Sequence, residues 1–420
     1  MTPELKGFLL VSVVKMLLVF TITMLGVAYM TFMERKVSAW MQNRLGPNRV
    51  GPGGWFQPIA DGIKNLLKEE TRPRSANLAL FFLAPCMSFI PALCVGAAIP
   101  WAAPVPVRFD FELPLLGRFS HDAVTSMAVA DLPVGFLFVL AISSLSVYGI
   151  AIAGWSSNSK YSLLGGLRAA AQMISYEVAM GMSLVPVLLI TGNVAFSNII
   201  GAQQEGLWFA LPLMVSAFVF LVSGLAETNR APFDLPEAES ELVAGYHTEY
   251  SAFKFSMFFI AEYAAVLTFS GMFAALFLGG WDLPFTHWDE QPGVLQTLVT
   301  GLVMAAKTTA LIFCVMWIRW TLPRFRYDQL MALGWKFMLP LALVNIMGVA
   351  VSAWFGRDVL HLTSPLALAG LLTAFSAVVT VFLFFVVDRG YLVRGVGSLD
   401  FMASRRTRPA RIRPVSREAA

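Results

Sequence analysis

Acidic side chains are concentrated in one stretch, residues 226–266, of a chain that is otherwise strongly apolar. From Glu227 to Glu262 this stretch contains seven acids and two bases, and apolar segments of membrane-spanning length lie on both sides of it. The acids are Glu227, Asp234, Glu237, Glu239, Glu241, Glu249 and Glu262, and the bases are Arg230 and Lys254. Carboxylates at the boundary of a hydrocarbon layer are costly to desolvate, so we expect them to serve a function.

Ionisable side chains also occur within other apolar segments. Glu177 lies well inside the segment 163–191, Lys307 lies inside another, and Asp131 begins a third. Carboxylates that are buried near one another exchange protons closer to neutral pH than exposed ones do. The pattern therefore indicates a proton or ion path rather than an inert anchor. For Glu177 the structural alternative is a neutral carboxyl group held by a hydrogen bond to a neighbouring helix.

The composition predicts which elements position these groups. The chain has 420 residues, of which 57% are hydrophobic and 13% charged, and its mean hydropathy is +0.68. Soluble proteins carry about 25% charged residues. Nine apolar runs of roughly membrane-spanning length predict an all-α, polytopic membrane helix bundle rather than a β-barrel. The predicted spans are residues 8–32, 78–101, 126–154, 163–191, 207–225, 252–279, 295–318, 335–355 and 364–387.

Basic residues occupy alternate connections between these spans. One set of connections contains most of the Lys and Arg side chains, whereas the other set contains only Arg108, Arg118 and Arg357. Basic loops remain on the cytoplasmic side of a membrane. We therefore expect a multi-pass protein of the plasma membrane with its N-terminus outside and its C-terminus in the cytoplasm. The first apolar run is too long for a signal peptide and is read as a retained helix.

The first cytoplasmic connection, residues 33–77, contains an amphipathic segment. Between Trp55 and Lys68, the apolar residues Phe56, Ile59 and Ile63 fall on one helical face and polar ones on the other. The segment is too short to span a bilayer, so we expect a helix at the membrane surface. The alternative is an ordinary loop helix that packs on the bundle.

No motif for a tightly bound cofactor is found in the sequence. Cys86, Cys94 and Cys314 are isolated in apolar segments and form no ligand cluster for iron–sulfur or zinc. The sequence also contains no glycine-rich nucleotide loop of the usual spacing. Any redox or nucleotide chemistry in which the chain takes part is therefore expected to be hosted elsewhere.

Four long motifs resemble the family of H subunits of proton-pumping NADH–quinone oxidoreductase, respiratory complex I. They are ERKVSAWMQNRLGPNRVGPGGWFQPIADGIKNLLKE, GLRAAAQMISYEVAMG, AETNRAPFDLPEAESELVAGYHTEY and RWTLPRFRYDQLMALGWKFMLPL, in the same order as in the family. The resemblance covers about residues 1–355 and implies eight family transmembrane helices. It divides the chain into a family-like domain, 1–357, and an addition, 358–420, which contains an extra C-terminal helix and a basic tail.

The resemblance also implies roles for particular side chains. The loops 33–77 and 226–250 would form a quinone chamber together with peripheral subunits. The quinone passage would involve Arg35, Arg44, Phe56, Asp61, Lys64 and Arg230. The proton and coupling path would involve Glu177, Glu227, Glu249 and Glu262, and the acidic chamber loop would contribute Asp234, Glu237, Glu239 and Glu241.

Quinone is then the expected substrate, with FMN and iron–sulfur clusters in partner subunits. The implied partners are the other subunits of a multi-subunit complex and lipid, with no nucleic acid. Two other functions remain open at this point. The chain could be the homologous membrane subunit of an energy-converting hydrogenase or of a complex with another donor, or it could be a stand-alone ion transporter.

Overall fold

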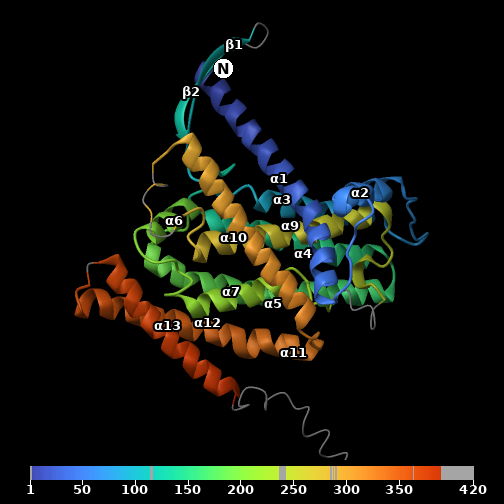
Figure 1. Cartoon of the computed structure of the whole chain (residues 1–420). Helices are drawn as coiled ribbons and strands as arrows, with labels where there is room; N and C mark the ends of the chain where they lie inside the picture. The colour runs from blue at the N-terminus through green and yellow to red at the C-terminus, as the bar shows by residue number, and fades with distance from the viewer. Residues whose placement is uncertain are drawn as a thin grey trace, which may run out of the picture.

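Long apolar helices dominate the computed structural model of the chain (Figure 1). The structure describes residues 2–113, 117–235, 243–283, 286, 288, 291–362 and 364–388. In these residues, eight helical segments are long and apolar enough to cross a membrane. The predicted fold class, an all-α polytopic membrane bundle, is confirmed.

The membrane-length segments are α1 (Pro3–Met41), α3 (Leu78–Val95), α4 (Gly135–Ser156), α5 (Lys160–Thr191), α9 (Ala252–Phe277), α10 (Val294–Thr321), Tyr327–Val359 and α13 (Pro365–Asp388). The segment Tyr327–Val359 consists of α11 (Tyr327–Ala332), the π-helix η4 (Leu333–Met338), α12 (Leu339–Trp354) and the π-helix η5 (Phe355–Val359). Shorter helices are η1 (Pro52–Gly54), α2 (Gln57–Leu67), α6 (Phe196–Gln204), α7 (Met214–Glu227) and η2 (Gly245–His247).

The helix α9 forms the centre of the bundle. In its most apolar window 78% of the residues are buried, compared with 6% in α1. Its inner residues, among them Phe273 and Phe277, pack with residues of α5 and α7 in the largest hydrophobic cluster. The side chains that α9 presents toward its neighbours are therefore shielded from lipid, which matters because Glu262 is one of them.

The predicted span at 207–225 is only partly a regular helix. α7 has 14 residues, which corresponds to about 21 Å at 1.5 Å per residue, whereas a hydrocarbon core is roughly 30 Å thick. Hydrogen-bonded turns at 209–213 precede it, because Pro212 has no N–H to donate just before the first regular turn. The last residue of α7 is Glu227, so this short helix carries a carboxylate into the bundle.

An antiparallel hairpin that the hydropathy pattern did not predict joins α3 and α4. The strands β1 (Val105–Leu113) and β2 (Gly117–Thr125) extend beyond the helices next to the N-terminal end of α1 (Figure 1). Phe111 stacks on Phe119, and Arg108 pairs with Asp122 at 2.8 Å. α3 ends at Val95 and α4 begins at Gly135, so both helices are shorter than the predicted spans 78–101 and 126–154.

The N-terminal half of α1 is held mainly by this hairpin region. A Cβ atom on Gly7 would collide with the backbone of Ser120, so the helix and β2 approach very closely. Further along α1, the Lys15 ammonium donates to the backbone oxygens of Ser126 at 3.2 Å and Ala128 at 2.9 Å. These contacts fasten a helix that otherwise exposes most of its apolar surface.

The additional helix α13 packs against α7 and α12. The Ser376 hydroxyl donates to the backbone oxygen of Pro212 at 2.6 Å, and Leu368 and Leu372 join the largest hydrophobic cluster. Gly348 of α12 leaves room for the ring of Phe375, which a Cβ atom would displace. The division of the chain at residue 357 stays a prediction, and the basic tail at 389–420 lies outside the described residues.

Close packing of α3 against α4 depends on Gly149. A Cβ atom there would lie 2.7 Å from the Ser88 nitrogen and 2.9 Å from the Ala84 oxygen, both of which belong to the backbone. We expect Gly149→Ala to destabilise the protein by about 1–3 kcal/mol, because the helices must move apart. The thermal unfolding midpoint of the purified complex measures this loss.

Gly181→Ala in α5 is the matched control, because nothing lies within 4 Å of the Cβ position at that glycine. This variant should be neutral, or stabilised by up to roughly 1 kcal/mol through the higher helix propensity of alanine. Equal midpoints for the two variants would contradict the packing argument.

Candidate functional site

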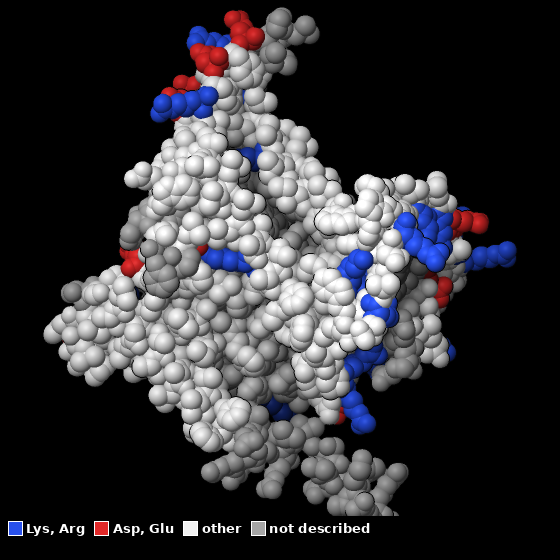
Figure 2. All heavy atoms as spheres, viewed as in Figure 1, with Lys and Arg blue, Asp and Glu red and all other residues white. Residues whose placement is uncertain are grey.

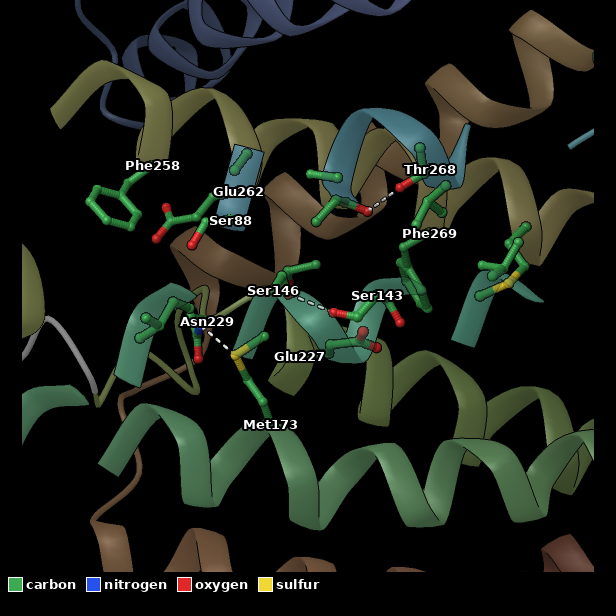
Figure 3. Close-up of a pocket in the computed structure, with 18 of the residues that line it drawn as sticks. Ser88, Ser143, Ser146, Met173, Glu227, Asn229, Phe258, Glu262, Thr268 and Phe269 are labelled. Atoms are coloured by element: carbon green, nitrogen blue, oxygen red, sulfur yellow. Dashed lines mark hydrogen bonds between the residues drawn. The ribbon is translucent and has the colours of Figure 1, made fainter. Parts of the chain in front are cut away.

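An internal cavity lies among α3, α4, α5, α9 and the C-terminal end of α7. Its volume is about 70 Å³, which is enough for several water molecules at roughly 10–15 Å³ each. The polar residues that line it are Ser88, Ser143, Ser146, Glu227, Thr228, Asn229, Glu262 and Thr268. Figure 3 shows Glu262 on α9 and Glu227 beside α7 on separate parts of its wall. The cavity thus joins two of the predicted path residues.

Glu262 has partners from two different segments. The buried Tyr246 hydroxyl donates to its Oε1 at 2.9 Å, and the Arg230 Nη2 lies 3.4 Å from its Oε2. The carboxylate side chain is 10% exposed and the Arg230 side chain 6%. Buried ion pairs are retained only where further polar contacts offset the cost of desolvation. Here the Tyr246 hydroxyl supplies one such contact.

A tight turn after α7 brings Arg230 to this position. Asn229 adopts φ 50°, a left-handed conformation that asparagine tolerates better than most residues. The buried Gln172 amide of α5 holds the turn by donating to the backbone oxygens of Ala226 and Phe233, each at 2.8 Å. The location of the only basic side chain in the turn is therefore fixed by α5.

Arg230 also connects Glu262 to a second charged pair. Its guanidinium lies over the Tyr263 ring, 4.1 Å from the centroid, in a cation–π contact. The Tyr263 hydroxyl donates to Glu34 Oε2 at 2.7 Å, and Arg319 of α10 forms an ion pair with the same carboxylate. Arg319 on α10, Glu34 on α1, Arg230 and Glu262 therefore form a series of charges of alternating sign. The series ends at the cavity wall.

Two further acids, Glu227 and Glu177, lie on the other side of the cavity from the charges around Glu262. Glu227 is the last residue of α7, and Ser143 of α4 lies beside its carboxyl group (Figure 3). Glu177 of α5 is partly buried and close enough to Glu227 for the two carboxylates to repel each other. A role of this pair in holding and passing a proton stays a prediction.

The segment 243–250 carries Tyr246 and is packed tightly against α5. A Cβ atom on Gly165 would lie 2.6 Å from the Cα atom of Gly245, so the segment sits directly on the helix. The Tyr250 ring stacks on the Phe81 ring with the two centroids 4.1 Å apart. The Tyr250 and Ser156 hydroxyl groups form a 3.1 Å hydrogen bond. Burial raises the pKa of the Tyr250 phenol to about 12, so it remains a neutral packing residue.

The predicted amphipathic helix is present as α2, and several predicted passage residues meet at its base. Arg35 Nη1 pairs with Asp61 Oδ2 at 2.7 Å, and the Gln57 amide donates to the other oxygen of Asp61 at 3.1 Å. Arg35 and Arg44 line one open groove of about 450 Å³. On the face shown in Figure 2, Lys and Arg side chains gather where α2 lies, whereas the surface of the long helices is largely uncharged.

The apolar face of α2 is uncovered. Phe56 and Ile59 are 52% and 56% exposed, and Leu66 and Leu67 are exposed still further. Lys64 is exposed as well. Contact of this face with the membrane surface remains a prediction.

Other predicted residues fall outside the cavity. Asp234 pairs with Arg324 at 2.9 Å and so ties the 226–235 segment to the connection after α10. Glu249 is partly buried in the turn before α9 and does not line the cavity. Glu237, Glu239 and Glu241 lie outside the described residues.

Two ionisable residues at the other end of the bundle, Asp131 and Lys307, form local hydrogen bonds and do not line the cavity. The expectation that Asp131 lies inside the bundle is wrong, because α4 begins only at Gly135 and the exposed Asp131 accepts a hydrogen bond from Ser197. Lys307 does lie inside, where its ammonium donates to the backbone oxygens of Leu278, Gly280 and Asp282 at 2.7–2.9 Å. Lys307 thereby provides hydrogen-bond donors for backbone oxygens that follow the C-terminal end of α9.

Comparisons with known proteins are consistent with one another. The profile of a protein family described as NADH dehydrogenase matches residues 14–350. The second H subunit of NADH-quinone oxidoreductase from Koribacter versatilis is 48% identical over 349 residues, which cover 82% of this chain and 97% of the relative. The first H subunit of the same enzyme from Geobacter metallireducens is 48% identical over 82% of this chain and 96% of its own length. The H subunit from Rhodospirillum rubrum is 47% identical, with 80% and 92% covered.

Proposed function

Because the chain belongs to the NADH dehydrogenase family, as the H subunit of NADH-quinone oxidoreductase, we propose that it forms part of the quinone-binding chamber and couples quinone reduction to proton translocation. In this proposal the groove at Arg35 and Arg44 belongs to the passage by which quinone arrives from the bilayer. The cavity between Glu262 and Glu227 belongs to the coupling path. The N-terminus lies outside the cell and the C-terminus in the cytoplasm.

The observation that carries the proposal is the linked series of charges between these two places. Arg35, which pairs with Asp61 at the groove, is the neighbour of Glu34 in the sequence. Glu34 accepts a hydrogen bond from the Tyr263 hydroxyl. The Tyr263 ring contacts Arg230, and Arg230 faces Glu262 on the cavity wall. A change of charge near the groove can therefore alter the proton affinity of carboxylates deeper in the bundle.

Reduction of a quinone to a quinol consumes two electrons and two protons. In the proposal the electrons arrive from FMN and iron–sulfur clusters in partner subunits, and the chain itself provides only protonatable and positioning groups. Uptake of the protons removes positive charge from the surroundings of the acidic loop, in which Asp234 is held by Arg324. The carboxylates at Glu262, Glu227 and Glu177 then exchange protons in turn, through the cavity.

The exposed face of α2 provides a direct test of the passage. We expect Ile59→Asp to reduce turnover with a long-tailed quinone several-fold, because an isoprenoid tail must pass an apolar surface and would have to desolvate a carboxylate placed on it. Turnover with a short-tailed, water-soluble quinone should change much less. The measurement is NADH-driven quinone reduction by the purified complex with both substrates.

Ile59→Val is the matched control, since it keeps the face apolar and should leave both rates near wild type. Equal losses with both quinones in Ile59→Asp would count against a passage at α2. The same assay separates the alternatives raised by the sequence, because neither a membrane subunit of a hydrogenase nor a stand-alone transporter would support NADH-driven quinone reduction.

A further inference from the structure

The helix α13 lines a second pocket at the end of the bundle opposite the turn that follows α7. Its volume is about 330 Å³. Its walls come from the C-terminal end of α5, the connection between α6 and α7, the π-helix η5 and the first turns of α13. The family profile ends at residue 350, before Arg357 and α13. The pocket thus combines residues inside the matched range, such as Glu205, with Arg357 and α13, which lie beyond it.

One base and one acid line this pocket. Arg357 is exposed, and its Nη2 makes only a long hydrogen bond, 3.4 Å, to the backbone oxygen of Ile190. Glu205, at the C-terminal end of α6, is exposed as well. In the described part of the chain neither side chain forms an ion pair. Each is therefore able to contact a charged group that enters the pocket.

The remaining wall contains the polar residues Thr191 and Ser364, and its apolar part continues into the core. Leu368 and Leu372 of α13 are 8% and 1% exposed, and Phe209 lies on the other side of the pocket at 4%. The aromatic side chains of Trp354 and Phe355 are exposed beside Arg357 in the sequence. Tryptophan and other aromatic residues gather at the level of lipid headgroups. The pocket therefore lies where a headgroup and the start of its acyl chains would meet the protein.

We infer that this pocket binds one phospholipid whose headgroup contains both a phosphate and a primary ammonium, as in a phosphatidylethanolamine. The phosphate accepts hydrogen bonds from Arg357, and the ammonium donates to Glu205. The first acyl carbons lie on Leu368 and Leu372. The inference stands apart from the quinone function, because none of these residues contacts the cavity or the groove described above.

The two charges select among lipids. A purely anionic headgroup such as phosphatidylglycerol would satisfy Arg357 but would place its negative charge near Glu205, with no cation to compensate. A choline headgroup is zwitterionic, but its quaternary nitrogen carries no N–H group and cannot donate a hydrogen bond. A primary ammonium satisfies both requirements.

The experiment measures lipids that stay bound to the purified, assembled complex. Lipids are extracted after extensive detergent washing and quantified per complex, for the wild type and for Arg357→Gln and Glu205→Gln. We expect one retained amine-headgroup phospholipid in the wild type and about tenfold less in Arg357→Gln, since a charge-assisted hydrogen bond is lost. Glu205→Gln should lower the ratio of ethanolamine to glycerol headgroups several-fold.

Arg108→Gln and Glu112→Gln on the hairpin are matched controls with the same charge changes, and they should retain the wild-type lipids. If a pocket variant fails to assemble, the wild-type complex is delipidated and titrated with each lipid class, and only the ethanolamine lipid should restore thermal stability. Equal retention or equal stabilisation by all classes would overturn the inference. So would a polypeptide from a partner protein filling the pocket in the assembled complex.

Discussion

Replacing Glu262 by glutamine is expected to lower proton pumping and quinone reduction roughly tenfold or more while the protein remains inserted in the complex. Glutamine keeps the shape of the side chain and still accepts from the Tyr246 hydroxyl, but it cannot bind and release a proton. It also leaves Arg230 facing a neutral amide on the cavity wall. Pumping and NADH-driven quinone reduction are measured in the same proteoliposomes.

A second variant separates loss of proton transfer from loss of stability. The double variant Glu262→Gln/Arg230→Gln removes both members of the buried pair and should recover assembly if the uncompensated arginine was the problem. It should not recover pumping. Glu177→Gln is expected to lower pumping too, whereas Glu112→Gln on the exposed hairpin should be silent. Wild-type turnover in an assembled Glu262→Gln complex would show that this carboxylate is not in the path.

Replacing Glu34 by alanine is expected to give the largest loss of stability. Its carboxylate is 9% exposed, pairs with Arg319 and accepts from the Tyr263 hydroxyl, so it joins α1, α9 and α10 at one point. Breaking a buried pair by removing one partner costs about 3–5 kcal/mol, because the remaining charge has lost its compensation. The thermal unfolding midpoint and the yield of assembled complex measure the effect.

Milder variants test whether the loss comes from the ion pair. Glu34→Gln can still accept from Tyr263 and should fall between wild type and Glu34→Ala. Tyr263→Phe removes one hydrogen bond and should cost about 1–2 kcal/mol, while its ring continues to contact Arg230. If Tyr263→Phe is as damaging as Glu34→Ala, the ion pair with Arg319 is not the main source of stability.

Hydropathy predicted the membrane helices well, because each long helix needs a long apolar run of its own. The amphipathic period predicted α2 because it too is a property of a short stretch of sequence and does not depend on distant residues. The hairpin was missed although Val105, Val107, Phe109 and Phe111 alternate with polar residues, because hydropathy averaged over a long window conceals a period of two. The regular part of α7 came out shorter than expected, since Pro212 shifted its start.

Residue type alone identified the acids of the site but not their partners. Glu177, Glu227 and Glu262 are conspicuous in apolar helices, yet Glu249 and Asp234 lie away from the cavity. Tyr246, Tyr263 and Gln172 were not singled out, because tyrosine and glutamine near a membrane surface are ordinary. The sequence gives no sign that Arg319 and Glu34 are partners, and only the packing of α10 against α1 shows their ion pair.

The fastening of α1 by the hairpin region has a consequence for the biosynthesis of the chain. The contact between Lys15 and the backbone oxygen of Ala128 spans 113 residues, so the first helix leaves the ribosome long before the segment that fixes it. At roughly 5–20 residues per second, translation alone separates the two by roughly 6–23 s. During that interval the helix lacks this contact, so its final position is set only after residues up to Ala128 have been made.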